Sequence, residues 1–292
     1  MTSYFLLRIR AKISSRFLKA PFRQAYNLFA LADHLSASDS QLIREEPLIK
    51  FSSKFEGENE RPSYLYISIC IYSLHPRELQ FLLKMASIVN RFFIISNCSQ
   101  HQHHSIPEIG LIWTRQNRGR DLGAVRDFLR KNFHLIQNTN LCIINSSCFW
   151  SEKRLTKLMH EIAWVDVDGV LFGTESTQGV NHFQTFLIMV PRQHLKNFAS
   201  CTEKMRNWRS KRAAVTFGEY KIAKTLNSRG IATTAIYSKD FINLDPKAVK
   251  GNVNPSLTNA GVLLGLGSPF IKKATFSKLL RSEYSSHCSE FL

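Results

Sequence analysis

One short stretch of this chain combines residue types that bind phosphate groups. It comprises Asn117, Arg118, Gly119, Arg120, Asp121 and Gly123, between an apolar run and a stretch with helical periodicity. Backbone N–H groups in a glycine-bearing loop can approach a phosphate closely, and a helix N-terminus adds positive potential. Arginine pairs with phosphate oxygens, while aspartate caps a helix or accepts from a sugar hydroxyl. The alternative interpretation is a helix cap with two solvated arginines.

Further polar residues follow apolar runs that have the composition of buried strands. In a parallel α/β sheet, ligands bind beyond the carboxyl ends of the strands. The residues at or just after such ends are Ser73, His75, Asn97, Asn117 and Asn145. His182 and Gln184 alternate with phenylalanines in a later run, so we expect them to face one side together and to contact a sugar. The alternative for this pair is a partly buried position at a sheet edge.

Strand-like and helix-like patterns alternate along most of the chain. Strands are expected over residues 64–72, 92–97, 109–114, 141–145, 169–173, 183–190 and 231–237. Helices are expected from residue 76 onward and over residues 125–133, 152–163 and 218–228. This alternation predicts an α/β fold in which helices flank a mainly parallel sheet.

Composition narrows the range of partners. The chain of 292 residues has 39 Lys and Arg against 22 Asp and Glu, a net charge of +17 that predicts anionic partners. No nucleic-acid-binding motif accompanies this charge, so nucleic acid is not an expected partner. The six cysteines form no CxxC pair and are expected to be reduced thiols of a cytoplasmic protein.

The N-terminal 35 residues combine basic and apolar side chains at helical spacing. The basic residues are Arg8, Arg10, Lys12, Arg16, Lys19 and Arg23, and no acidic residue precedes Asp33. Such a helix can lie on an anionic membrane surface, or it can pack on the domain with a solvated basic face. We expect a linker over residues 36–62, a main domain over 63–280 and a tail over 281–292.

Six segments along about 200 residues carry a resemblance to a known family. In order and composition they resemble the rhamnan synthesis protein F family, glycosyltransferases of bacterial polysaccharide assembly with a GT-A-like fold. The segments are NRGRDLGA at 117–124, INSSCFW at 144–150, GTEST at 173–177, HFQTFLIMV at 182–190, GEYKIAKTLNSRG at 218–230 and NPSLTNAGVLLGLGSPFIKK at 254–273.

The resemblance implies transfer of a sugar from a nucleotide-sugar donor to a lipid-linked or nascent polysaccharide. The protein would then be attached peripherally to the inner face of the plasma membrane. The strand ends at Ser73–His75 and Asn97, and the stretch over residues 117–123, would border the donor. Glu219, expected to open a helix, would be the general base that activates the acceptor hydroxyl, with Glu175 as the second candidate. The alternative for Glu219 is a first-turn residue that only stabilises its helix.

One departure from the family pattern concerns the metal. GT-A enzymes usually end the fourth strand with Asp-x-Asp, whereas this strand ends in Asn145, Ser146 and Ser147. The missing carboxylates count against dependence on Mg²⁺ or Mn²⁺, and no organic cofactor is expected. They also favour a second class of function, a non-catalytic relative that binds within a polysaccharide assembly complex.

Other apparent metal motifs have simpler interpretations. The triplet Asp166-Val167-Asp168 precedes a strand, so it is expected to be a turn. The histidines at 101, 103 and 104 are expected to lie in a solvated loop.

Overall fold

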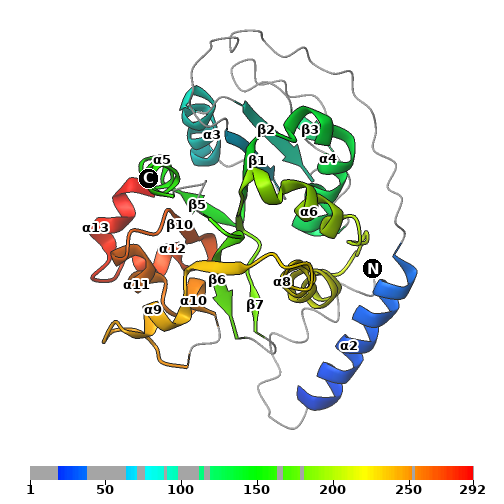
Figure 1. Ribbon diagram of the computed structural model, residues 1–292. Coiled ribbons are helices and arrows are strands. Elements are labelled where there is room, and N and C mark those ends of the chain that lie inside the picture. The colour runs from blue at the N-terminus through cyan, green and yellow to red at the C-terminus, as the bar shows by residue number, and fades with distance from the viewer. Residues whose placement is uncertain are drawn as a thin grey trace.

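The computed structural model describes residues 19–37, 64–70, 76–88, 91–97, 112–114, 119–162, 167–177, 181–251 and 254–291. These residues form a mixed α/β structure around one large sheet (Figure 1). Its strand order is β3-β2-β1-β4-β8-β6-β7, with β9 also paired to β6. The bounds are β1 Tyr64–Cys70, β2 Arg91–Ser96, β3 Ile112–Thr114, β4 Asn140–Asn145, β6 Val170–Ser176, β7 His182–Phe183, β8 Leu187–Val190 and β9 Thr233–Tyr237.

Strand direction follows the length of the connections. The pairs β1–β2, β1–β4, β2–β3 and β6–β9 are parallel, whereas β8 is antiparallel to both β4 and β6. The sheet is therefore mixed, which corrects the expected mainly parallel arrangement at β7 and β8. Strand β7 is antiparallel to β6 as well. The reason is that residues 177–181 and 184–186, which join β6 to β7 and β7 to β8, are too short for the crossover that a parallel pairing of consecutive strands needs. The expected single strand over residues 183–190 is also interrupted, by a turn at residues 185–186.

Helices cover both faces of the sheet. The helices α4 Arg120–Ile136, α6 Arg192–Thr202 and α8 Tyr220–Asn227 share one hydrophobic cluster with the sheet, and α3 Pro76–Ile88 and α5 Glu152–Glu161 share another. Strand β4 is buried throughout: Leu141 and Ile143 enter the first cluster, and Cys142 and Ile144 enter the second. Full burial of such side chains contributes about 1.5–3 kcal/mol each. This is the three-layer packing that the continuous apolar strands predict.

The C-terminal part forms a smaller layer beside β4. Strand β5 Cys148–Trp150 pairs antiparallel with β10 Phe270–Lys272. Around this pair lie α9 Lys239–Asn243, α10 Pro255–Thr258, α11 Ala260–Gly265, α12 Lys273–Leu279, α13 Ser285–Cys288 and the turn Ser289–Phe291. Cys288 and Phe291 are buried in a cluster with Leu264 and Phe276. Residues 281–291, expected as a tail, thus pack against the main domain.

Two further features of the chain bear on the sequence predictions. Cys142, Cys148, Cys201 and Cys288 are buried free thiols, as expected. The first described helix, α2 Lys19–Ser36, lies at the outside of the molecule (Figure 1, blue). Within the described ranges, none of the helices has both the length and the apolar character needed to cross a membrane.

We predict that Gly261→Ala destabilises the protein by about 1–3 kcal/mol, the usual cost of overpacking a core. A Cβ at Gly261 would lie 2.3 Å from ring atoms of Tyr284, so α11 or residues 281–291 would have to shift. Gly265→Ala, in the same helix, is the matched control because a Cβ there meets nothing within 4 Å. Urea unfolding of both variants measures the difference. Equal stability of the two variants would contradict the described packing of Tyr284.

Candidate functional site

Polar groups converge where β4 ends. The side-chain amide of Asn145 donates to Oδ2 of Asp121 at 2.5 Å. Its carbonyl oxygen Oδ1 accepts from the backbone N–H of Ser147 at 3.0 Å and from the Ser147 hydroxyl at 2.5 Å. Asn145 and Ser147, the two site residues predicted at the strand end, are thus joined to Asp121, which was predicted within residues 117–123. Asn145 holds that stretch against the sheet.

Asp121 lies in the first turn of α4, which begins at Arg120 rather than at the predicted residue 125. Gly119 precedes the helix with φ +71°, and a Cβ there would lie 2.9 Å from the Arg206 carbonyl oxygen. Its N–H donates to the Trp208 carbonyl at 2.7 Å, and the Gly123 N–H donates to the Gly119 carbonyl at 2.8 Å. These glycines therefore serve close packing, and their N–H groups are already used. The expectation that they present N–H groups to a phosphate is corrected.

Glu219 does not open a helix, contrary to the prediction. A continuous helical run begins with α7 Lys211–Ala214, passes through a π-helical turn at Val215–Glu219, and continues as α8. Ser210 caps the start of this run, so Glu219 lies in its middle and caps nothing. Both the helix-opening and the first-turn interpretations are therefore wrong. A π turn shifts the side chains that follow it, and such turns are frequent at functional sites.

The π turn directs Glu219 toward the sheet. The Thr185 hydroxyl donates to Oε1 of Glu219 at 3.2 Å, and Nε2 of His182 lies 4.0 Å from Oε2. Burial, followed by the negative charge of Asp121, raises the pKa of Glu219 to about 7. Asp121 is also in a poorly solvated position, and burial raises the pKa of its carboxyl as well. The site therefore contains two neighbouring carboxyl groups, one with a pKa near neutrality.

Lys272 brings a positive charge to these carboxyl groups. Its ammonium donates to the Ser147 hydroxyl at 2.9 Å and lies 4.0 Å from the centre of the Phe186 ring. Its charge lowers the pKa of both Glu219 and Asp121, opposing the effect of burial. Sequence reasoning did not assign it a role. In the sequence, Lys272 stands out only by belonging to the segment over residues 254–273 that carries the family resemblance. Nothing in the sequence shows that β10 pairs with β5.

The remaining candidates have other partners. Gln184 accepts from the Thr174 hydroxyl at 2.8 Å and donates to Asn254 at 3.1 Å. Glu175 accepts from the first backbone N–H of α9, that of Lys239, at 2.8 Å. Its carboxylate therefore binds a helix N-terminus, which stabilises a negative charge.

The structure leaves part of the predicted donor side undescribed. Asn97 follows β2 and is buried. Ser73, His75, Asn117 and Arg118 lie outside the described residues, as do the histidines at 101, 103 and 104.

Metal-binding groups are sparse in the described part of the chain. No cluster of three or more His, Cys, Asp or Glu side chains there could hold an ion. The Asp168 side chain is 97% exposed, lies 3.9 Å from His194 and belongs to the connection before β6. Asp166 lies outside the described residues.

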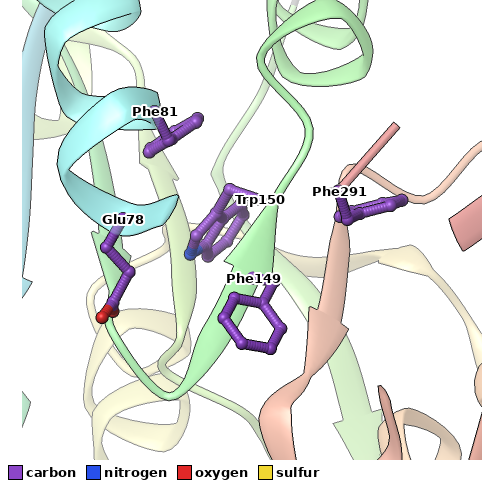
Figure 2. A pocket seen from close by; sticks show the side chains of 5 residues that line it. All are labelled: Glu78, Phe81, Phe149, Trp150 and Phe291. Atoms are coloured by element: carbon purple, nitrogen blue, oxygen red, sulfur yellow. The ribbon is translucent and has the colours of Figure 1, made fainter. Parts of the chain in front are cut away.

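An aromatic pocket lies apart from these groups. It is lined by Glu78, Phe81, Phe149, Trp150 and Phe291 (Figure 2). The Glu78 carboxylate is paired with Lys273 at 2.7 Å, so the polar group of this pocket is already neutralised. The pocket shares no lining residue with the site around Glu219.

Comparisons with known proteins give little further guidance. No protein-family model matches the chain, and no curated protein sequence matches it. One similar solved structure is 2-C-methyl-D-erythritol 4-phosphate cytidylyltransferase of Francisella tularensis, at 9% identity and a TM-score of 0.37. The match covers 70% of this chain and 99% of that one. At this TM-score the likeness carries no argument, and the resemblance to the rhamnan synthesis family stays a prediction.

We predict that Glu219 destabilises the folded protein as the pH rises. The folded-state pKa of about 7 lies above the ordinary pKa of a glutamate, so the folded protein holds this proton more tightly than the unfolded chain. Stability from this group is fully present below the lower value and is lost as the pH rises through the higher one. The free energy of unfolding of Glu219→Gln, relative to wild type, should therefore be greater at about pH 8 than at about pH 5. A difference that does not change between the two pH values, measured by urea unfolding, would contradict the raised pKa.

Proposed function

We propose that the protein is a glycosyltransferase that moves a sugar from a nucleotide-sugar donor to an acceptor hydroxyl. The observation that carries this proposal is Glu219, a carboxyl with a pKa of about 7 that stands beside His182 and Thr185. A general base works best when its pKa is near the operating pH. Perturbed carboxyl groups of this kind are also concentrated at functional sites.

Glu219 acts as the base in the proposed reaction. Its carboxylate takes the proton of the acceptor hydroxyl while the hydroxyl oxygen attacks the anomeric carbon of the donor sugar. The bond from that carbon to the diphosphate oxygen breaks, and its electron pair leaves with the nucleoside diphosphate. Attack from the face opposite the leaving group inverts the configuration at that carbon. The Thr185 hydroxyl orients the carboxylate through its hydrogen bond.

The donor side is assigned to the start of α4 and the end of β4. Oδ1 of Asp121 is buried and accepts no hydrogen bond from any residue in the described ranges. Arg120, Lys211 and Lys272 surround this carboxyl with positive charge. A negatively charged diphosphate is favoured in such surroundings.

The acceptor is the less constrained half of the proposal. A lipid-linked or nascent surface polysaccharide of the rhamnan, O-antigen or capsule type follows from the sequence resemblance alone. The second candidate function is a non-catalytic binding subunit of a polysaccharide assembly complex. The observation that favours it is the strand end at Asn145–Ser147, which lacks a carboxylate.

Helix α2 supports attachment to an anionic membrane. Its inner side is fixed to the domain: the Asp33 carboxylate accepts from the Ser210 N–H at 2.8 Å, and Nδ1 of His34 accepts from the Trp208 indole at 3.0 Å. Its outer side carries apolar residues at helical spacing, and Leu28 and Leu35 are 66% and 70% exposed. Together with the six basic residues that precede Asp33 in the sequence, this outer face fits an interface of acyl chains and anionic headgroups.

We predict that Glu219→Gln lowers turnover by about 10²–10⁴-fold, the usual contribution of a general base. Glutamine keeps the shape and the hydrogen bond from Thr185 but cannot take the proton. Donor binding should change little, because the lost group acts on the acceptor. Glu175→Gln is the matched control and should retain turnover.

Transfer rates and calorimetric donor affinities for the two variants test this assignment. Wild-type turnover in Glu219→Gln would reject Glu219 as the base, and loss of turnover in Glu175→Gln alone would transfer the role to that residue. Donor binding without any turnover in the wild-type protein would favour the non-catalytic alternative.

For membrane attachment, we predict that the full chain sediments at low salt with vesicles of phosphatidylglycerol and phosphatidylethanolamine. Leu28→Asp combined with Leu35→Asp should abolish this binding, because charged residues are expelled from the acyl region. Leu244→Asp is the control, since Leu244 is 78% exposed and lies outside α2. Equal sedimentation of all three proteins would mean that α2 serves only to pack against the domain.

A further inference from the structure

The residues at the end of β4 do not fit a divalent cation. Mg²⁺ and Mn²⁺ require several oxygen ligands, among which carboxylates supply the charge. Here Oδ1 of Asn145 already accepts two hydrogen bonds from Ser147, and the amide of Asn145 faces Asp121. The Ser147 hydroxyl accepts from the Lys272 ammonium, so a positive charge already lies at this strand end. A dication would have to displace it or be repelled by it.

The fold places Lys272 there through strand pairing. Lys272 lies opposite Cys148 in the β5–β10 pair, and Cys148 directly follows Ser147 in the chain. The ring of Phe186 covers its ammonium, which is a favourable cation–π arrangement. The next residue, Lys273, forms an ion pair with Glu78, so the charges of the two lysines act on different groups.

Lys272 retains capacity for a ligand. An ammonium group has three N–H donors; one of them donates to the Ser147 hydroxyl and another faces the Cys148 thiol, which leaves one for a ligand. Its charge also reaches Asp121 and Glu219, the two carboxyl groups of the site. An anion bound beside Ser147 would therefore meet a preformed cation that neither carboxylate pairs with directly.

We propose that Lys272 supplies the positive charge that binds the diphosphate of the donor, so that binding needs no divalent cation. This inference rests on the proposed function and deepens it, because it concerns the leaving group of the same reaction. As the bond between the anomeric carbon and the diphosphate oxygen breaks, negative charge grows on that oxygen. An ammonium within hydrogen-bonding distance stabilises this developing charge more strongly than it stabilises the intact donor. Arg120 and Lys211 add to the positive potential.

Calorimetry with UDP, GDP and dTDP as probes tests the proposal on the full chain. Wild-type protein should bind at least one of them with the same affinity in EDTA as in Mg²⁺ or Mn²⁺. Lys272→Met should weaken that binding about tenfold or more, as expected when a charge-assisted hydrogen bond is lost. Lys272→Arg should restore part of the affinity. Lys273→Met is the matched control and should bind like wild type.

The other possible results of these measurements separate the role of Lys272 from the proposed function. Binding that requires the metal ion, or Lys272→Met binding like wild type, would overturn the role of Lys272 and leave the glycosyltransferase proposal standing. If the wild-type protein bound none of the three diphosphates and none of their sugar nucleotides, the proposed function itself would be overturned. Melting temperatures of the variants distinguish a lost contact from a lost fold, and Lys272→Arg provides the second test if Lys272→Met unfolds.

Discussion

Two carboxyl groups share one poorly solvated site in this protein, and the site is organised around that constraint. Asp121 and Glu219 cannot both ionise freely, because partial burial disfavours each negative charge and Asp121 raises the pKa of Glu219. The amide of Asn145 hydrogen-bonds to Asp121 and favours its ionised form. The ammonium of Lys272 partly compensates both charges. The balance of these effects leaves the pKa of Glu219 at about 7.

Segments far apart in the chain build this balance. Asp121 comes from the start of α4, Asn145 from the end of β4, Glu219 from the π turn and Lys272 from β10. The π turn is itself braced from outside: Phe217, two residues before Glu219, stacks on His34 of α2 at 3.9 Å between ring centres. The helix that we propose to lie on the membrane therefore contacts the turn that positions the proposed base.

Much of the scaffold was predictable from local patterns. The buried apolar run of β4 and the start of α3 at residue 76 each have a local physical cause, and each was predicted at its observed place. The polar residues at strand ends were identified for the same reason. Asn145, Asp121, Glu219 and His182 were all candidates before their contacts were known. The interruption between β7 and β8, which brings Thr185 to Glu219, has no comparable local signal.

The sequence by itself determined the central strands, several of the helices that flank them and which polar side chains stand near strand ends, because apolar periodicity acts over a few residues. Only the tertiary structure decided the antiparallel direction of β8, the π turn around Glu219 and the arrival of Lys272 beside Ser147. Those features depend on connection length, on packing between helices and on pairing between β5 and β10, whose paired residues lie more than a hundred positions apart. A lysine's role in this site is set by the charges it meets in space, and neighbouring residues in the chain do not reveal them.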